Sequence, residues 1–150
     1  MKDNTVVTNR AARRDYFILE TLEAGLELKG SEVKSLRAGK ASLAESFARV
    51  DGTEIFLYHM HVNPYEYTNL KEQDPLRPKK LLLHRKEINY LMAKISQKGL
   101  AIVPLKVYFN KGIAKVELAV AKGKKFYDKR EAIKQKEAQR NMDRVKRYKI

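Results

Sequence analysis

Hydrophobic and polar residues alternate along Tyr16–Lys29, with leucines and an alanine on one side of the run and mainly charged residues on the other. An alternation of period two predicts a half-buried β-strand. Gly25 lies inside this strand, where a glycine indicates a bend or a close approach of another part of the chain. Next, Ser31 predicts the N-cap of a short helix over Glu32–Ala38, and Gly39 predicts its end.

An Asp-Gly pair separates the next two strand-like runs, Ser42–Val50 and Glu54–Val62. This combination predicts a β-hairpin whose turn lies at the pair. Residues 63–80 follow and contain three of the four prolines, so they predict a long loop. Loops of this length inside a compact domain tend to be functional or mobile.

Apolar residues at helical spacing predict a helix over residues 84–98. A second hairpin follows, with one strand along Val103–Phe109, a turn at Asn110–Gly112 and a returning strand along Val116–Val120. Pro104 cannot donate a backbone hydrogen bond, which indicates that its strand begins at an edge or a bulge.

Five strand-like runs and two helices predict a mainly β fold with helices (β+α). The architecture that we favour is a small closed antiparallel barrel of oligonucleotide-binding type, because closure removes exposed sheet edges. A β-sandwich fits the pattern nearly as well. Residues 1–14 predict a flexible basic N-terminal arm, residues 15–123 a β-barrel domain, and residues 124–150 a basic C-terminal tail that is helical or disordered.

The net charge of the chain indicates its class of partner more clearly than the rest of its composition does. Thirty-two Lys and Arg residues against 18 Asp and Glu give a net charge of +14. A balance this basic favours a polyanionic partner, with nucleic acid ahead of an anionic membrane surface, because the basic parts lack a strongly apolar face. Without an apolar leader region or a long apolar run, the sequence predicts a cytoplasmic protein that does not enter a membrane.

Catalysis finds little support among the residue types present. The chain has no cysteine. His59 and His61 would share one face of a strand, but no carboxylate lies nearby at metal-ligand spacing, so a structural or surface role is favoured. Glu23 and Glu27 also alternate on a strand, where a solvated face is the ordinary interpretation. No glycine-rich phosphate loop or nucleophile elbow is present. We therefore expect no enzyme activity, no metal and no cofactor.

Basic residues instead gather in four clusters, with aromatic residues between them. Together they predict a surface that follows phosphates and offers rings to unstacked bases. The clusters are Arg10–Arg14, Lys34–Lys40, Arg77–Lys80 and Lys122–Arg130, and the aromatic residues are Tyr16, Phe17, Tyr65, Tyr67 and Tyr127.

The blocks EVKSLRAGKASL and GKKFYDKR, with NRAARRDYFILETLEAGLELKG before them and DPLRPKKLLLHRKEI between them, resemble small protein B, the SsrA-binding protein family. The resemblance implies an oligonucleotide-binding-type barrel that binds the tRNA-like domain of tmRNA (SsrA RNA). It implies delivery of that RNA, with elongation factor Tu bound through the charged tmRNA, to stalled ribosomes for trans-translation, which is ribosome rescue with peptide tagging. The protein would stand at the small-subunit decoding region against rRNA, as a monomer, and do no chemistry itself. A resident ribosomal protein or general translation factor that binds rRNA is the alternative.

The resemblance and the basic clusters together give the expected RNA-binding residues. These are Asn9, Arg10, Arg13, Tyr16, Glu23, Gly25, Lys34, Arg37, Gly39, Lys40, Lys79, Lys80, Lys122, Gly123, Lys124 and Lys125. The expected ribosome-engaging tail comprises Tyr127, Asp128, Lys129, Arg130, Lys134, Lys136 and Arg140. Tyr127 stands where some family members have histidine, and a stacking role would survive that exchange. A carboxylate such as Glu23 repels phosphate, so we expect it to accept a hydrogen bond from a base amino group or a 2′-hydroxyl.

Overall fold

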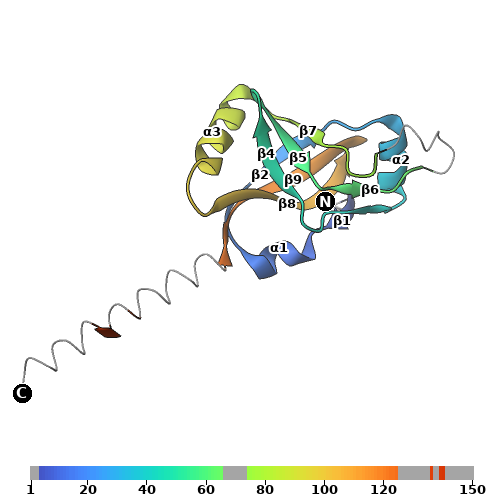
Figure 1. Ribbon diagram of the computed structural model, residues 1–150. Helices are drawn as coiled ribbons and strands as arrows, with labels where there is room; N and C mark the ends of the chain where they lie inside the picture. The colour runs from blue at the N-terminus through green and yellow to red at the C-terminus, as the bar shows by residue number, and fades with distance from the viewer. Residues whose placement is uncertain (1–3, 66–73, 125–135, 137–138, 141–150) are drawn as a thin grey trace, which may run out of the picture.

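The computed structural model describes residues 4–65, 74–124, 136 and 139–140 (Figure 1). In chain order, its elements are β1 (Asn4–Thr8), α1 (Arg10–Asp15), β2 (Tyr16–Leu26), α2 (Gly30–Arg37), β3 (Ala41–Ser42), β4 (Phe47–Asp51), β5 (Glu54–Tyr58), β6 (His61–Val62), β7 (Lys79–Leu82), α3 (Arg85–Ile95), β8 (Leu100–Asn110) and β9 (Ile113–Gly123). Among these elements, no helix has the length and hydropathy that a membrane crossing requires.

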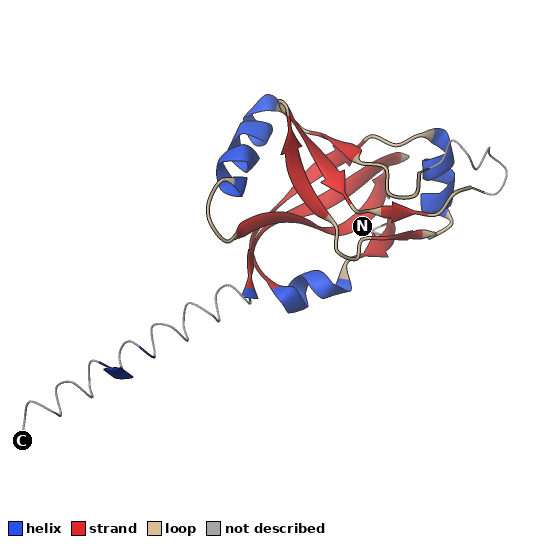
Figure 2. Ribbon diagram, viewed as in Figure 1, coloured by secondary structure: helices blue, strands red, loops and turns tan. Residues whose placement is uncertain are grey.

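Most strands belong to one antiparallel sheet whose order is β1-β8-β4-β5-β7-β2-β9. Because β8 also pairs with β9, six of these strands form a closed ring, and β1 adds to β8 from outside the ring (Figure 2). Closure pairs the backbone groups that an open sheet would leave at its edges. The prediction of a sheet-dominated β+α fold is confirmed.

The alternation on β2 sets which side chains face the inside of this ring. Ala24 and Leu26 are buried in the main hydrophobic core, with Leu22 packed against it. α3 adds Ile88 and Leu91 to the same core. A second, smaller cluster forms where Ala12 of α1 packs on Val103, Leu105, Ala119 and Ala121 of β8 and β9.

Residues 4–14 differ from the mobile arm that the sequence pattern predicted. Asn4–Thr8 pair with β8, and Arg10–Asp15 form α1 against the sheet. The backbone N–H of Asn9 donates to the carbonyl of Leu105 at 2.7 Å, and its side-chain amide donates to the carbonyl of Pro104 at 2.9 Å. The prediction missed both elements because their partners lie almost a hundred residues further along the chain.

Two predicted strands are each broken by a residue with left-handed backbone. Glu45 (φ 61°) separates β3 from β4, and His59 (φ 64°) separates β5 from β6. The expectation that His59 and His61 share a strand face is therefore wrong. The Asp-Gly hairpin itself is confirmed as β4–β5, with Gly52 at φ 65°.

The helix boundaries follow from carboxylates that reach back to the preceding turn. Glu32 accepts a hydrogen bond from the backbone N–H of Lys29 at 2.7 Å, which makes Lys29 the N-cap of α2 in place of the predicted Ser31. Glu87 does the same for the N–H of His84 at 3.0 Å and begins α3. Each of these contacts satisfies a backbone N–H that has no partner within the helix.

The remaining comparisons concern the second hairpin and the proline-rich loop. β8 and β9 form the predicted hairpin, and its register shifts between Pro104 and Lys106, which confirms a bulge at the proline. Lys79–Leu82, placed partly in the predicted loop, form β7 between β5 and β2. The tail prediction falls almost wholly outside the described residues.

Candidate nucleic-acid interface

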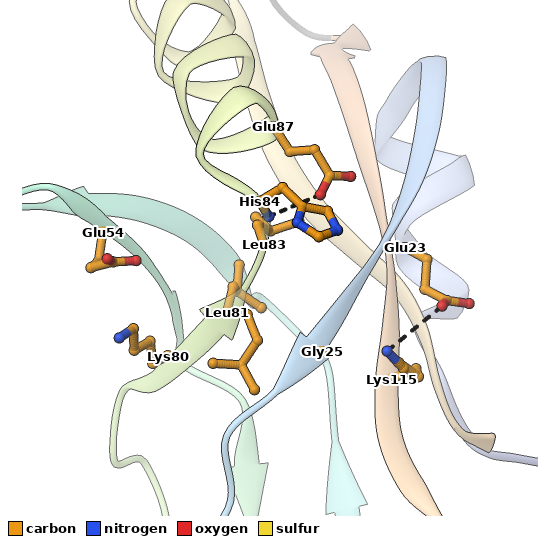
Figure 3. A pocket seen from close by; sticks show the side chains of 10 residues that line it. Glu23, Gly25, Glu54, Lys80, Leu81, Leu83, His84, Glu87 and Lys115 are labelled. Atoms are coloured by element: carbon orange, nitrogen blue, oxygen red, sulfur yellow. Dashed lines mark hydrogen bonds and ion pairs between the residues drawn. The ribbon is translucent and has the colours of Figure 1, made fainter. Parts of the chain in front are cut away.

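An open hollow of about 490 Å³ lies between β2, β7, β9 and the start of α3 (Figure 3). It combines carboxylates, lysines and three consecutive leucines. Its lining residues are Glu23, Gly25, Glu54, Lys80, Leu81, Leu82, Leu83, His84, Glu87 and Lys115. Three predicted RNA-binding residues, Glu23, Gly25 and Lys80, thus come together from distant parts of the sequence.

Glu23 is held in place at the side of this hollow by two neighbours on the sheet. It accepts a hydrogen bond from the hydroxyl of Tyr108, and its carboxylate lies 3.9 Å from Nζ of Lys115. Lys106 and Glu117 form a second pair on the adjacent strands, also at 3.9 Å. A carboxylate fixed in this way can accept a hydrogen bond from a base or sugar, while Lys115 supplies the charge that a phosphate needs.

Gly25 makes room for Leu82, which lies directly opposite it on β7. A Cβ atom at residue 25 would come within 3.0 Å of the Leu82 Cβ. Leu82 remains 47% exposed even though it lies within the sheet. The glycine therefore lets β2 and β7 approach closely while an apolar side chain faces the hollow, where it can pack against an unstacked base.

Lys79 and Lys80 were both predicted to bind RNA, and the structure separates them. Lys80 lines the hollow. Lys79 points the opposite way and is fully buried, with Nζ donating to the carbonyls of Met60 at 3.1 Å and Arg77 at 2.7 Å. Burial lowers the pKa of Lys79 to about 8, although the nearby Glu32 carboxylate opposes that shift. The prediction that Lys79 contacts RNA is wrong, because successive strand residues face opposite sides of the sheet.

Glu32 is the centre of the buried ion cluster to which Lys79 belongs. Its carboxylate accepts two hydrogen bonds from Arg77, at 2.5 and 3.1 Å, and lies 3.9 Å from Nζ of Lys79. Burial raises the pKa of Glu32, but the Arg77 and Lys29 hydrogen bonds and the two positive charges outweigh it and hold the pKa below its ordinary value. This cluster fastens the N-terminal end of α2 to the segment that precedes β7.

α2 and the turn after it carry a second group of predicted residues, Lys34, Arg37, Gly39 and Lys40. The ammonium of Lys34 lies over the Tyr65 ring at 5.3 Å, and the Arg37 guanidinium lies over the Phe109 ring at 4.6 Å. Gly39 has φ 73°, a backbone conformation that favours glycine, and ends the helix as predicted. Figure 1 shows α2 and α3 at opposite ends of the ring, so this group is distinct from the hollow.

A third group surrounds the start of β2 and the end of β9. Tyr16 pairs with Gly123, and Phe17 pairs with Lys122. Lys124 lies over the Phe17 ring at 5.1 Å. α1 precedes this point and exposes Arg10 and Arg13, whereas the side chain of Asn9 is engaged with the backbone of β8. The geometry thus gives Asn9 a role in anchoring α1.

The remaining predicted residues belong to the basic tail. Lys136 and Arg140 are exposed and have helical backbone. Lys125, Tyr127, Asp128, Lys129, Arg130 and Lys134 lie outside the described residues. No cluster of His, Asp and Glu suited to a metal ion occurs in the part of the chain that the structure describes.

Sequence reasoning missed seven lining residues of the hollow, among them Leu82 and Lys115. Lys115 alternates with buried residues on β9, and that pattern marks it as outward-facing. Its position beside Glu23 depends on the register between β2 and β9, which pairs residue 25 with residue 115. Leu82 lies in a run of three leucines, a pattern that does not indicate which of them is exposed.

Comparison with known proteins places these features in a family. Residues 6–148 match the family model "SmpB protein". An SsrA-binding protein from Pelotomaculum thermopropionicum is 58% identical over 145 residues, which cover 97% of this chain and 95% of the relative. Another from Desulforudis audaxviator is 58% identical over 147 residues, 98% and 96% of the two chains.

A solved structure is also similar in fold and sequence. A chain from "tmRNA-SmpB: a journey to the center of the bacterial ribosome" is 54% identical, with a TM-score of 0.66. The match covers 77% of this chain and 82% of that chain. By the length of the family match and the identity of its relatives, the chain belongs to the SmpB protein family.

Proposed function

We propose that this protein binds tmRNA (SsrA RNA) through its tRNA-like domain and brings it to stalled ribosomes for trans-translation. The observation that carries the proposal is family membership over residues 6–148, together with relatives that are SsrA-binding proteins. A net charge of +14 supplies the electrostatic attraction that an RNA partner requires.

The hollow is the part of the surface best suited to specific recognition. Glu23 offers a fixed acceptor, Leu82 offers an apolar contact and Lys115 offers a positive charge. Such a combination reads base edges and sugars, whereas lysines alone read only phosphates. The basic groups on α1, on α2 and at the end of β9 would add affinity that depends on salt.

The finer architecture belongs to the same proposal. We infer that the closed six-stranded ring serves as a barrel of oligonucleotide-binding type, supported by its antiparallel pairing and by the bulge at Pro104. Residues 15–123 would form the RNA-binding domain. Residues 124–150 would be a tail that engages rRNA at the small-subunit decoding region, with its eleven basic side chains as the means of attachment.

This role needs no covalent step by the protein. In this proposal the protein acts as a monomer in the cytoplasm, where ribosomes work, and contacts elongation factor Tu only indirectly, through the charged tmRNA. Support comes from the lining of the hollow, which offers hydrogen-bond acceptors and charges suited to binding RNA.

Truncation before Asp128 tests the division of labour between body and tail. The truncated protein should bind the tRNA-like domain with near-normal affinity and fail to support peptide tagging on stalled ribosomes. Lys115→Ala in the full-length chain should instead weaken binding to the tRNA-like domain directly, and any loss of tagging should follow from that loss of binding. Loss of RNA binding in parallel with tagging on truncation would place the tail within the tmRNA site and refute the division.

A further inference from the structure

Two exposed aromatic rings lie beyond the hollow, on β2 and α3. Phe17 is 40% exposed and Tyr90 is 43% exposed. Each ring has a lysine ammonium over it: Lys124 at 5.1 Å from the Phe17 centroid, and Lys94 at 5.4 Å from the Tyr90 centroid. We call these four residues the ring patch.

A bulge in β2 brings the two halves of the ring patch to the same side of the sheet. Ile18 pairs with Ala121 and Glu20 pairs with Val120, so Leu19 is an extra residue between them. Without the bulge, Phe17 and Glu20 would face opposite sides, because strand residues alternate. With the bulge they face the same side, about 7 Å apart, because their partners on β9 are only two residues apart.

Glu20 connects this side of β2 to α3. The hydroxyl of Tyr90 donates a hydrogen bond to the Glu20 carboxylate, so the Tyr90 ring is fixed over the sheet. Glu87, which lines the hollow, precedes Tyr90 by three residues and lies on the same face of α3. The ring patch faces the opposite side of β2 from Glu23, and α3 connects it with the hollow through Glu87.

We propose that RNA bound at the hollow extends along α3 onto the ring patch, where unpaired bases stack on Tyr90 and Phe17. A base has a flat face and a phosphate attached to it, and each half of the ring patch offers a ring and an ammonium. A stacking base displaces the ammonium from the ring face, and Lys94 and Lys124 then pair with the phosphates. The occupant is an unpaired segment of the same RNA that the hollow holds, so the inference rests on the proposed function.

Tryptophan fluorescence gives a direct test, since the chain contains no tryptophan. In Tyr90→Trp, oligouridine should quench the new fluorophore, and an abasic oligomer with the same number of phosphates should not. Leu76→Trp, at a leucine that is 50% exposed and outside the ring patch, is the matched control and should respond equally weakly to both. Equal quenching by both oligomers at residue 90, or by a polyglutamate peptide as strongly as by oligouridine, would overturn stacking.

Affinity for the tRNA-like domain completes the test. Tyr90→Leu and Phe17→Leu should each weaken binding at least about five-fold, the lower end of what a lost stacking ring causes. Tyr90→Phe keeps the ring and loses only the hydroxyl, so it should bind within about two-fold of the wild type. Wild-type binding with no loss in either leucine variant overturns the ring patch alone. Failure of the wild-type protein to bind overturns the proposed function, and this inference with it.

Discussion

Replacing Lys79 on β7 should lower the stability of the fold, whereas replacing its neighbour Lys80 should weaken RNA binding. Lys79 is fully buried and donates to the carbonyls of Met60 and Arg77, whereas Lys80 lines the hollow. Lys79→Met keeps most of the packed volume but leaves both carbonyls without that donor. A hydrogen bond from a charged donor contributes about 1.5–3 kcal/mol, and removing the buried ammonium recovers part of its desolvation cost.

The net loss of stability expected for Lys79→Met is therefore about 1–3 kcal/mol. Lys79→Ala adds a cavity and should lose about 2–5 kcal/mol. Lys80→Ala should stay within about 0.5 kcal/mol of the wild type, as for other surface substitutions. Urea denaturation followed by circular dichroism measures these differences, and the Lys79→Met midpoint should fall by roughly 1 M.

RNA binding should divide the two lysines the other way. Lys80→Ala should weaken binding to the tRNA-like domain and reduce the slope of log affinity against log salt by about 0.7–0.9, the value for one phosphate contact. Lys79→Met should leave the slope unchanged when affinity is corrected for the folded fraction. Exposed Lys111 in the β8–β9 turn provides a matched control for loss of one charge. A reduced salt slope together with unchanged stability in Lys79→Met would refute the burial argument.

Four further substitutions test the buried cluster and the hollow. The pKa of Glu32 lies below its ordinary value of 4.5, so the ionised carboxylate stabilises the fold above that pH and loses this effect as the pH falls through the lowered pKa. Glu32→Gln should therefore have a lower urea midpoint than the wild type at pH 7. In a pH series, the difference between the two midpoints should narrow below about pH 4.5. Gly25→Ala places a Cβ 3.0 Å from that of Leu82, so it should lower the free energy of unfolding measured in urea by about 1–3 kcal/mol and weaken RNA binding. An unchanged RNA affinity would show that Leu82 is not part of the RNA contact. Glu23→Ala should reduce the preference for the tRNA-like domain over unrelated RNA, whereas Lys115→Ala should weaken binding to both RNAs. Competition binding measures the affinity for each RNA. Equal losses on both RNAs for Glu23→Ala would contradict its role as a specific acceptor.

Local patterns in the sequence were enough to determine β2, the two hairpins and α3, but not β1, α1 or β7. The alternation on Tyr16–Leu26 gave the strand and its buried face, because a strand places successive residues on opposite sides. The glycine after Asp51 and the spacing of Ile88 and Leu91 gave the first hairpin and α3. In each case the determining interaction lies within a few residues of the pattern itself.

Family membership was also predictable from the sequence, since the blocks that carry the resemblance are contiguous. The matched region, residues 6–148, includes all of them. Net charge pointed to a polyanionic partner without any knowledge of the fold. Composition and contiguous motifs survive in a one-dimensional description, and for that reason the kind of partner was visible before the arrangement of the site.

Tertiary structure alone decided which predicted residues meet. The register between β2 and β9 places Lys115 beside Glu23, and closure of the ring places Leu82 against Gly25. Arg77 and Lys79 looked like a surface cluster but turn inward to Glu32, since two carbonyls and a carboxylate there replace the water that a lysine otherwise needs. Such contacts join residues that are tens of positions apart in the sequence, and a local sequence pattern does not indicate which distant residues will meet in the folded chain.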